Sequence, residues 1–160
     1  MKNGRTLYDS MPENSPKAGI NLDTFWDYYK NGKTEFDKVC LLAYLAIRSV
    51  LQNQAYTKLT TPYLLSRMAG KTHSIAPEAL PHDILKYNID YRMRKIKTAL
   101  RDGWGLITYS RHLRGFYVSY KMTLDELVFE AEKRRKSTKE KQYKLKEKEA
   151  LAKALQKLNA

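Results

Sequence analysis

Apolar residues recur at helical spacing along several stretches of the chain. The longest stretch, residues 34–54, places them at i, i+3, i+4 and i+7, and this pattern predicts a buried central helix that begins near Thr34 and Asp37. A shorter stretch, residues 22–29, predicts a helix that docks on the core through its apolar and aromatic side chains. Those side chains are Leu22, Phe25, Trp26 and Tyr29.

Two further helices are predicted after the central helix. Residues 61–69 form one, which ends at Gly70 because glycine readily takes the positive φ found at helix C-termini. Residues 89–102 form the other, with Asn88 as its N-cap and Gly103 as its stop. Its inward stripe at i, i+4, i+7 and i+11 comprises Ile89, Met93, Ile96 and Leu100.

β-forming residues mark a hairpin after these helices. Residues 104–109 and 116–120 are two runs of β-branched and aromatic residues around a short basic segment, which is typical of an antiparallel hairpin. Residues 56–60 are a further short run of β-formers. After the hairpin, Thr123 and Glu126 have capping-box spacing and predict a further helix. The residues expected on its inward face are Leu124, Leu127, Val128 and Ala131.

These patterns divide the chain into three parts. Residues 1–21 contain glycine and proline without any period, and we expect a flexible arm there. Residues 22–121 form the folded domain, and residues 122–160 form a charged C-terminal helix that projects from it. The predicted fold class is α+β, mostly α with a small β-hairpin. Self-association through the C-terminal helix is left open, and it would use Leu151, Leu155 and Leu158.

The charge of the chain indicates what kind of partner it binds. Its 160 residues carry 30 Lys and Arg against 17 Asp and Glu, a formal net charge of +13, which favours a polyanionic partner and nucleic acid first. Residues 81–121 are the most one-sided part, with 9 basic and 3 acidic side chains. The longest apolar run, residues 39–47, is too short for a bilayer that needs about 20 residues. We therefore expect a cytoplasmic protein that has no membrane partner.

Catalytic and metal-binding patterns are not found in the sequence. Cys40 is the single cysteine and lies in an apolar run, so it fits a buried thiol in a reducing compartment. The histidines His73, His82 and His112 lack the spacing of a metal site. No glycine-rich loop cradles a phosphate, and no cluster of carboxylates suits the Mg²⁺ of a nuclease. We therefore expect that the protein is not an enzyme and that it binds no metal and no cofactor.

Over residues 35–121 the order of elements resembles the winged helix-turn-helix family. The third helix of this span, residues 89–102, is basic and runs through a glycine into the first strand of the hairpin. The resemblance implies the winged-helix fold for residues 35–121, with a third helix that enters the major groove of double-stranded DNA. The extended charged C-terminal helix that the pattern predicts is appended to this fold. Arg94 is the best-placed base reader, because a guanidinium can contact guanine O6 and N7 together. The expected base-reading residues are Tyr91, Arg94, Lys95 and Thr98.

The resemblance also implies contacts outside the third helix. The hairpin tip would act as a wing on the minor groove or the backbone, through Arg111, His112 and Arg114. The expected DNA-backbone contacts are Tyr63, Arg67, Lys71, Thr72, Arg92, Lys97 and Arg101. The 17 residues 71–87 replace the tight turn of the family. They hold either an extra helical turn at residues 77–80 or further DNA contacts through Lys71, Thr72 and His73.

The sequence therefore predicts a site-specific double-stranded-DNA-binding protein that acts as a homodimer or on repeated sites. The resemblance implies a transcription regulator, or an accessory protein at a replication or transfer origin, encoded by a bacterium, plasmid or phage. An RNA-binding or protein-interaction module that uses the same basic face is the alternative. Exposed rings would favour RNA, because RNA modules stack bases on them. The pattern assigns Tyr44, Trp104, Phe116 and Tyr120 to the core instead.

Overall fold

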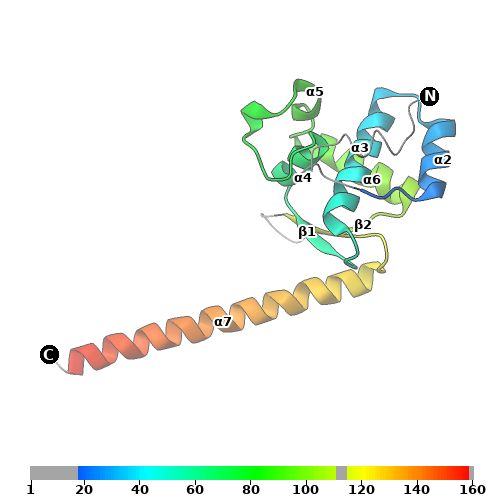
Figure 1. Ribbon diagram of the computed structural model, residues 1–160. Coiled ribbons are helices and arrows are strands. Elements are labelled where there is room, and N and C mark those ends of the chain that lie inside the picture. Colours follow the sequence, from blue (N-terminus) through cyan, green and yellow to red (C-terminus); the bar gives the residue numbers. More distant parts are fainter. Residues whose placement is uncertain (1–17, 111–114, 159–160) are drawn as a thin grey trace.

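The computed structural model describes residues 18–110 and 115–158 (Figure 1). Arg111, His112 and Arg114 of the expected wing tip lie outside the described residues, as does most of the expected arm. The same holds for the side chains of Leu151, Leu155 and Leu158.

The described residues form mostly helices with one small sheet, which confirms the α+β class. A body of short helices surrounds the central helix, and one long helix leaves the body beside the sheet (Figure 1). In chain order the elements are α2 (Leu22–Asn31), α3 (Glu35–Leu51), β1 (Thr57–Leu59), α4 (Thr61–Met68), the 3₁₀ helix η1 (Pro77–Ala79), α5 (His82–Leu85), α6 (Asp90–Trp104), β2 (Ile107–Tyr109), β3 (Phe116–Ser119) and α7 (Leu124–Leu158).

The sheet is antiparallel with the order β1-β3-β2, so the expected hairpin is confirmed and the short run of β-formers becomes its third strand. Tyr117 in β3 lies opposite Lys58 on one side and Tyr109 on the other. Gly115 has φ +99°, and a Cβ there would lie 2.4 Å from the Leu59 carbonyl oxygen. Only glycine permits this close approach of the hairpin to β1.

The core lies between α3, α4, α6 and the sheet. Central helix α3 begins as expected: Thr34 Oγ1 accepts from the Asp37 N–H at 3.1 Å, and Asp37 Oδ2 accepts from the Thr34 N–H at 2.9 Å. These two bonds satisfy amide donors that a helix start leaves unpaired. The largest fully buried side chains are Ile47, Leu51, Leu59, Leu64, Leu65, Met93, Ile96, Leu100, Leu106, Leu127 and Val118.

Helix α4 is bounded by the residues next to its predicted ends. Thr60 caps it through Oγ1, which accepts from the Tyr63 N–H at 3.3 Å. At the other end Gly70 has φ +75°, its N–H donates to Arg67 O at 3.0 Å, and the Lys71 N–H donates to Ser66 O at 2.9 Å. This pair of bonds is a Schellman motif, which needs a positive φ, so the expected role of Gly70 is confirmed.

Helix α6 differs from its prediction at both ends. Ile89 is its N-cap and is 54% exposed, so the expected cap at Asn88 and the inward position of Ile89 are wrong. Gly103 continues the helix, which ends at Gly105 with φ +69°. The reason lies in the next residue: Leu106 is fully buried and its N–H donates to Leu100 O at 3.1 Å. Anchoring Leu106 keeps the chain helical past Gly103.

Helix α2 does not dock through the four side chains that the pattern selects, so that expectation is wrong. Leu22, Phe25, Trp26 and Tyr29 are exposed, and the buried residue of the helix is Thr24. The side that faces the body carries Asp27, whose Oδ2 accepts from Trp104 Nε1 at 2.8 Å, and the half-buried Tyr28. The Asn21 N–H also donates to the Tyr44 hydroxyl at 3.4 Å.

Helix α7 opens with the expected capping box, in which the Thr123 N–H donates to Glu126 Oε2 at 2.8 Å. Leu127 and Ala131 are buried as expected and Val128 is half-buried, whereas Leu124, the first residue of the helix, is exposed, so its expected inward position is wrong. The helix then extends far from the body (Figure 1). The described part of the chain contains no helix that is both long enough and apolar enough to cross a membrane.

The segment between α4 and α6 is built from two short helical pieces. The 3₁₀ helix η1 is the extra turn that the sequence left open, and α5 was not foreseen. Leu80, Ile84 and Tyr87 from this segment are buried in the core. The segment is therefore an integral part of the domain and brings Lys86 and Tyr87 next to the start of α6.

Candidate nucleic-acid interface

One side of α6 is held by the core and the other is free for a partner. Met93, Ile96 and Leu100 are buried, which fixes the rotation of the helix about its axis. The opposite side carries the four expected base-reading residues and Arg101, all of them exposed: Tyr91, Arg94, Lys95, Thr98 and Arg101.

The cations on this side differ in how firmly they are held. Arg94 has no hydrogen bond or ion pair with any residue that the structure describes. The Lys95 ammonium lies 4.8 Å from the centre of the Tyr91 ring. Arg101 Nε pairs with Asp102 Oδ1 at 2.8 Å, but both side chains are about 60% exposed, so the pair is weak. Among the cations on the exposed side of α6, Arg94 therefore makes the fewest contacts with the rest of the described residues.

Lys97 is tied to the sheet. Its ammonium lies 3.5 Å from the centre of the Phe116 ring, a cation–π contact at the edge of the hairpin. Burial lowers the pKa of Lys97, an effect that Asp90 opposes and Arg94 reinforces. Lys97 therefore links α6 to β3.

Arg67 was expected to contact the DNA backbone, and its guanidinium faces α3 instead. Its Nη2 donates to Ser49 Oγ at 2.8 Å and to Ser49 O at 3.2 Å, and its Nε donates to the same hydroxyl at 3.1 Å. These bonds also hold the guanidinium 5.9 Å from the centre of the Tyr63 ring. Arg67 therefore joins α4 to α3, and only its remaining N–H donors are available to a ligand.

The other expected backbone contacts form two groups. Tyr63 lies in the first turn of α4, and its hydroxyl donates to the carbonyl oxygen of Thr72, which follows Lys71 after the end of the helix, at 3.5 Å. Lys71 and Thr72 are exposed. Arg92 lies at the start of α6, where its Nη1 donates to Lys86 O at 2.9 Å.

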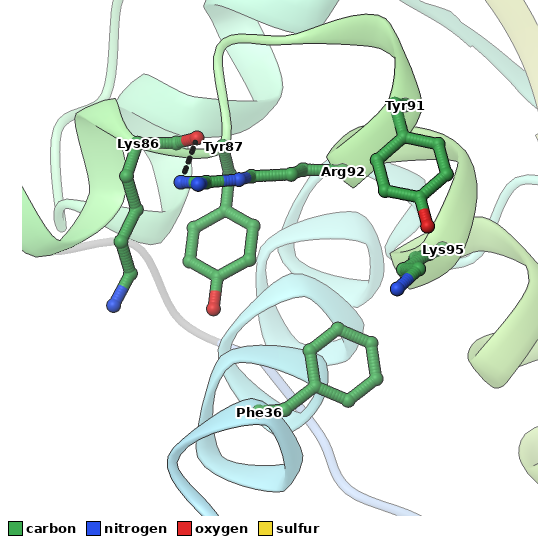
Figure 2. A pocket seen from close by; sticks show the side chains of 6 residues that line it. All are labelled: Phe36, Lys86, Tyr87, Tyr91, Arg92 and Lys95. Carbon is green, nitrogen blue, oxygen red and sulfur yellow. Dashed lines mark hydrogen bonds between the residues drawn. The ribbon is translucent and has the colours of Figure 1, made fainter.

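Arg92 also borders a pocket that the sequence did not predict. The pocket has a volume of about 470 Å³ and lies between the start of α3, the end of α5 and the start of α6 (Figure 2). The sequence pattern assigned Phe36 to the core and left Lys86 and Tyr87 in a linker. The signal in the sequence was the alternation of cations and rings over residues 86–95. Its lining residues are Phe36, Lys86, Tyr87, Tyr91, Arg92 and Lys95.

The described residues offer no centre for metal-dependent or thiol chemistry. They contain no group of three or more His, Cys, Asp or Glu that could hold a metal ion. Burial raises the pKa of Cys40 to about 11, and nearby Asp37 adds to the shift. The thiol is therefore protonated at neutral pH and a poor nucleophile.

The exposed cations and aromatic side chains can recognise anions and planar rings. Both features meet at the start of α6, where Tyr91 and Lys95 belong to the exposed side of the helix and to the pocket. Comparisons of the chain with protein-family models, with curated proteins and with solved structures find no match.

Proposed function

We propose that the chain is a site-specific double-stranded-DNA-binding protein of the winged helix-turn-helix type. The observation that carries the proposal is the exposed cationic side of α6, opposite the buried stripe of Met93, Ile96 and Leu100. The order α3, β1, α4, α6, β2 and β3, with β3 in the middle of the sheet, agrees with it. In this proposal α6 enters the major groove and the β2–β3 hairpin is the wing.

The proposed roles follow from the contacts that each side chain makes within the protein. An α-helix about 10–12 Å across fits the major groove, and Arg94 is free to reach a base edge there. Tyr91, Lys95 and Thr98 lie beside it. Lys71, Thr72, Arg92 and Arg101 are assigned to phosphates, whereas Arg67 and Lys97 mainly hold α4 and α6 in place.

We further propose a biological setting on the resemblance alone. The protein acts by binding and not by catalysis, as a transcription regulator or as an accessory protein at a plasmid or phage replication or transfer origin. It works in the bacterial cytoplasm, as a homodimer or on repeated sites. Footprinting of tight binders selected from a random duplex pool gives the length of the site and shows whether it repeats.

The test of the proposed function is Arg94→Ala on the selected site and on random duplex. Losing a bidentate guanine contact costs about 1–3 kcal/mol, so affinity for the preferred site should fall roughly 5-fold to 150-fold. Affinity for random duplex should change little. Lys121→Ala is the control, because Lys121 is an exposed cation after β3 and away from α6.

Equal weakening on both duplexes would make Arg94 a phosphate contact and not a base reader. The salt dependence of binding provides a second measurement. With about six phosphate contacts, the slope of log K against log salt should be about −5. A protein that binds no duplex, or a slope near zero, would contradict the proposed function.

One observation favours the RNA-binding alternative, in which unpaired bases are recognised. Phe25, Trp26, Tyr29 and Tyr91 are exposed rings, and RNA modules stack unpaired bases on such side chains. Competition between the selected duplex and a single-stranded RNA pool separates the two. An RNA that displaces the duplex at lower concentration would favour the alternative.

A further inference from the structure

The pocket at the start of α6 has the size and the walls of a small-molecule site. Its volume of about 470 Å³ lies within the range of roughly 300–1,000 Å³ that is usual for ligand pockets. Three elements contribute to it: Phe36 comes from α3, Lys86 and Tyr87 follow α5, and the remaining residues come from α6 (Figure 2). A ligand there would contact helices that the core already holds in position.

The charged lining of the pocket is entirely positive. Lys86, Arg92 and Lys95 line it, and no acidic side chain does. The Arg92 guanidinium is held by its bond to Lys86 O at 2.9 Å, and the Lys95 ammonium lies over the Tyr91 ring (Figure 2). The carboxylate of Glu35 interacts with Lys86 at longer range but is paired with Lys38 at 2.6 Å. The pocket therefore favours an anion.

Lys86 and Arg92 lie on one side of the pocket and Lys95 on the other, beside Tyr91 (Figure 2). The pair of cations on one side, with a third nearby, suits a phosphate monoester better than a single carboxylate. A phosphate monoester carries about −1.5 to −2 charges at pH 7 and three acceptor oxygens, whereas a carboxylate carries one charge. Arginine and lysine donors both bind phosphate oxygens well. The charge in the pocket thus points to a phosphate group.

The rings supply the second half of the recognition. Phe36 is half-buried, Tyr87 is 8% exposed and Tyr91 is 63% exposed. Figure 2 shows the Tyr87 and Tyr91 rings approaching the pocket from above, with the Phe36 ring below them. Aromatic side chains stack on the flat face of any nucleobase.

We propose that this pocket binds one nucleotide, with the base against Phe36, Tyr87 and Tyr91 and the phosphate on Lys86 and Arg92, while Lys95 adds positive charge on the Tyr91 side. The site does not depend on the proposed binding of duplex DNA. The nucleotide is either a free mononucleotide or the 5′-phosphorylated end of a single strand. Both present the same base and phosphate monoester to the pocket.

Calorimetric titration of the full chain tests the proposal. The probes are the mononucleotides AMP, GMP, CMP and UMP, with adenosine and inorganic phosphate as the two halves of the ligand. At least one mononucleotide should bind, and adenosine and phosphate should each bind at least tenfold more weakly. A 5′-phosphorylated oligonucleotide of six residues, compared with its unphosphorylated form, tests the strand end as the source.

Two variants test the two halves of the site in the same titration. Lys86→Gln removes a cation and Tyr91→Leu removes a ring, and both side chains are exposed, so folding is preserved. Each variant should weaken binding of the effective probe at least fivefold, whereas Lys121→Gln should leave it unchanged. Thermal unfolding of each variant checks the fold.

Each outcome decides the proposal. Binding of a mononucleotide that both variants weaken supports the free nucleotide as ligand. Binding of the phosphorylated strand alone, with the same loss in the variants, supports the strand end. Inorganic phosphate binding as tightly as every mononucleotide, binding that neither variant changes, or no binding of any probe would overturn it.

Discussion

Helices α2 and α6 carry apolar side chains at the same helical spacing, yet only α6 buries them. Met93, Ile96 and Leu100 of α6 are between 0% and 2% exposed, whereas the residues of the α2 stripe are between 42% and 70% exposed. That stripe is Leu22, Phe25, Trp26 and Tyr29. Helical period identifies the residues that share one side of a helix. It does not say which side meets the core, because that depends on the surfaces that other elements offer.

The surroundings of the two helices explain the difference. Helix α6 lies against α3 and continues into the hairpin, so its apolar side meets other apolar residues. Helix α2 faces two polar groups of the body. The Tyr44 hydroxyl accepts from the N–H of the N-cap Asn21, and the indole N–H of Trp104 donates to Asp27. The rings of the α2 stripe contact one another instead, with Phe25 and Tyr29 stacked at 6.4 Å between centres.

The largest effect that tests this comparison is expected at the centre of α6. Leu100→Ala should lower the free energy of unfolding by about 2–5 kcal/mol, because it removes buried methyl groups and leaves a cavity. Leu22→Ala in α2 is the matched control and should cost no more than about 0.5 kcal/mol, since Leu22 is exposed. Urea unfolding of both variants measures the difference. Equal losses would show that the two apolar stripes are buried alike.

An intermediate effect is expected where the two helices are joined. Trp104→Phe keeps a ring beside Tyr44 but removes the N–H that donates to Asp27, so it should cost about 1 kcal/mol. Trp26→Phe is the matched control, because the Trp26 ring is exposed and makes only ring contacts within α2. Urea unfolding is again the measurement.

The effect of Trp104→Phe should also depend on pH. Hydrogen bonds from Trp104 first, and then from Asn31, lower the pKa of Asp27 below its ordinary value of 3.8. The stabilisation is therefore complete above about pH 4 and is lost as the pH falls through the lowered pKa. Hydrogen exchange of the α2 amides in wild type and Trp104→Phe should differ at pH 6 and converge at low pH. A difference that persists at low pH would rule out the Asp27 carboxylate as the acceptor that matters.

The smallest effect is expected on the exposed side of α2. Trp26→Ala should change the free energy of unfolding by less than about 0.5 kcal/mol, as exposed substitutions usually do. Ile96→Ala in α6 is the contrast and should cost several times more, because Ile96 is fully buried. If Trp26→Ala costs about 2 kcal/mol and the loss grows with protein concentration, a second molecule covers the α2 rings in solution.

Local signals in the sequence predicted the fold well where one residue acts on its neighbours. The capping boxes at Thr34 and Thr123, the positive φ of Gly70 and the hairpin all depend on contacts within a few residues. The end of α6 was misplaced because the burial of Leu106, and not the first available glycine, decides where the helix stops.

The candidate site was predictable only in part, for a related reason. Helical spacing identified the exposed side of α6, including Arg94. It could not reveal that Arg67 binds Ser49 across 18 residues or that Lys97 lies on the Phe116 ring, since both partners come from other elements. The pocket escaped prediction because Phe36 lies 50 residues before Lys86 in the chain.

The sequence by itself determined the class of fold, the order of its main helices and strands, the one-sided charge of the chain and the residues that α6 presents. These depend on composition and on spacing within single elements, which the chain carries without reference to its fold. Only the tertiary structure decided that α2 turns its rings outward, that some cations are bound internally, and that rings and cations meet in one pocket. Those properties depend on which surfaces are brought together from distant parts of the chain.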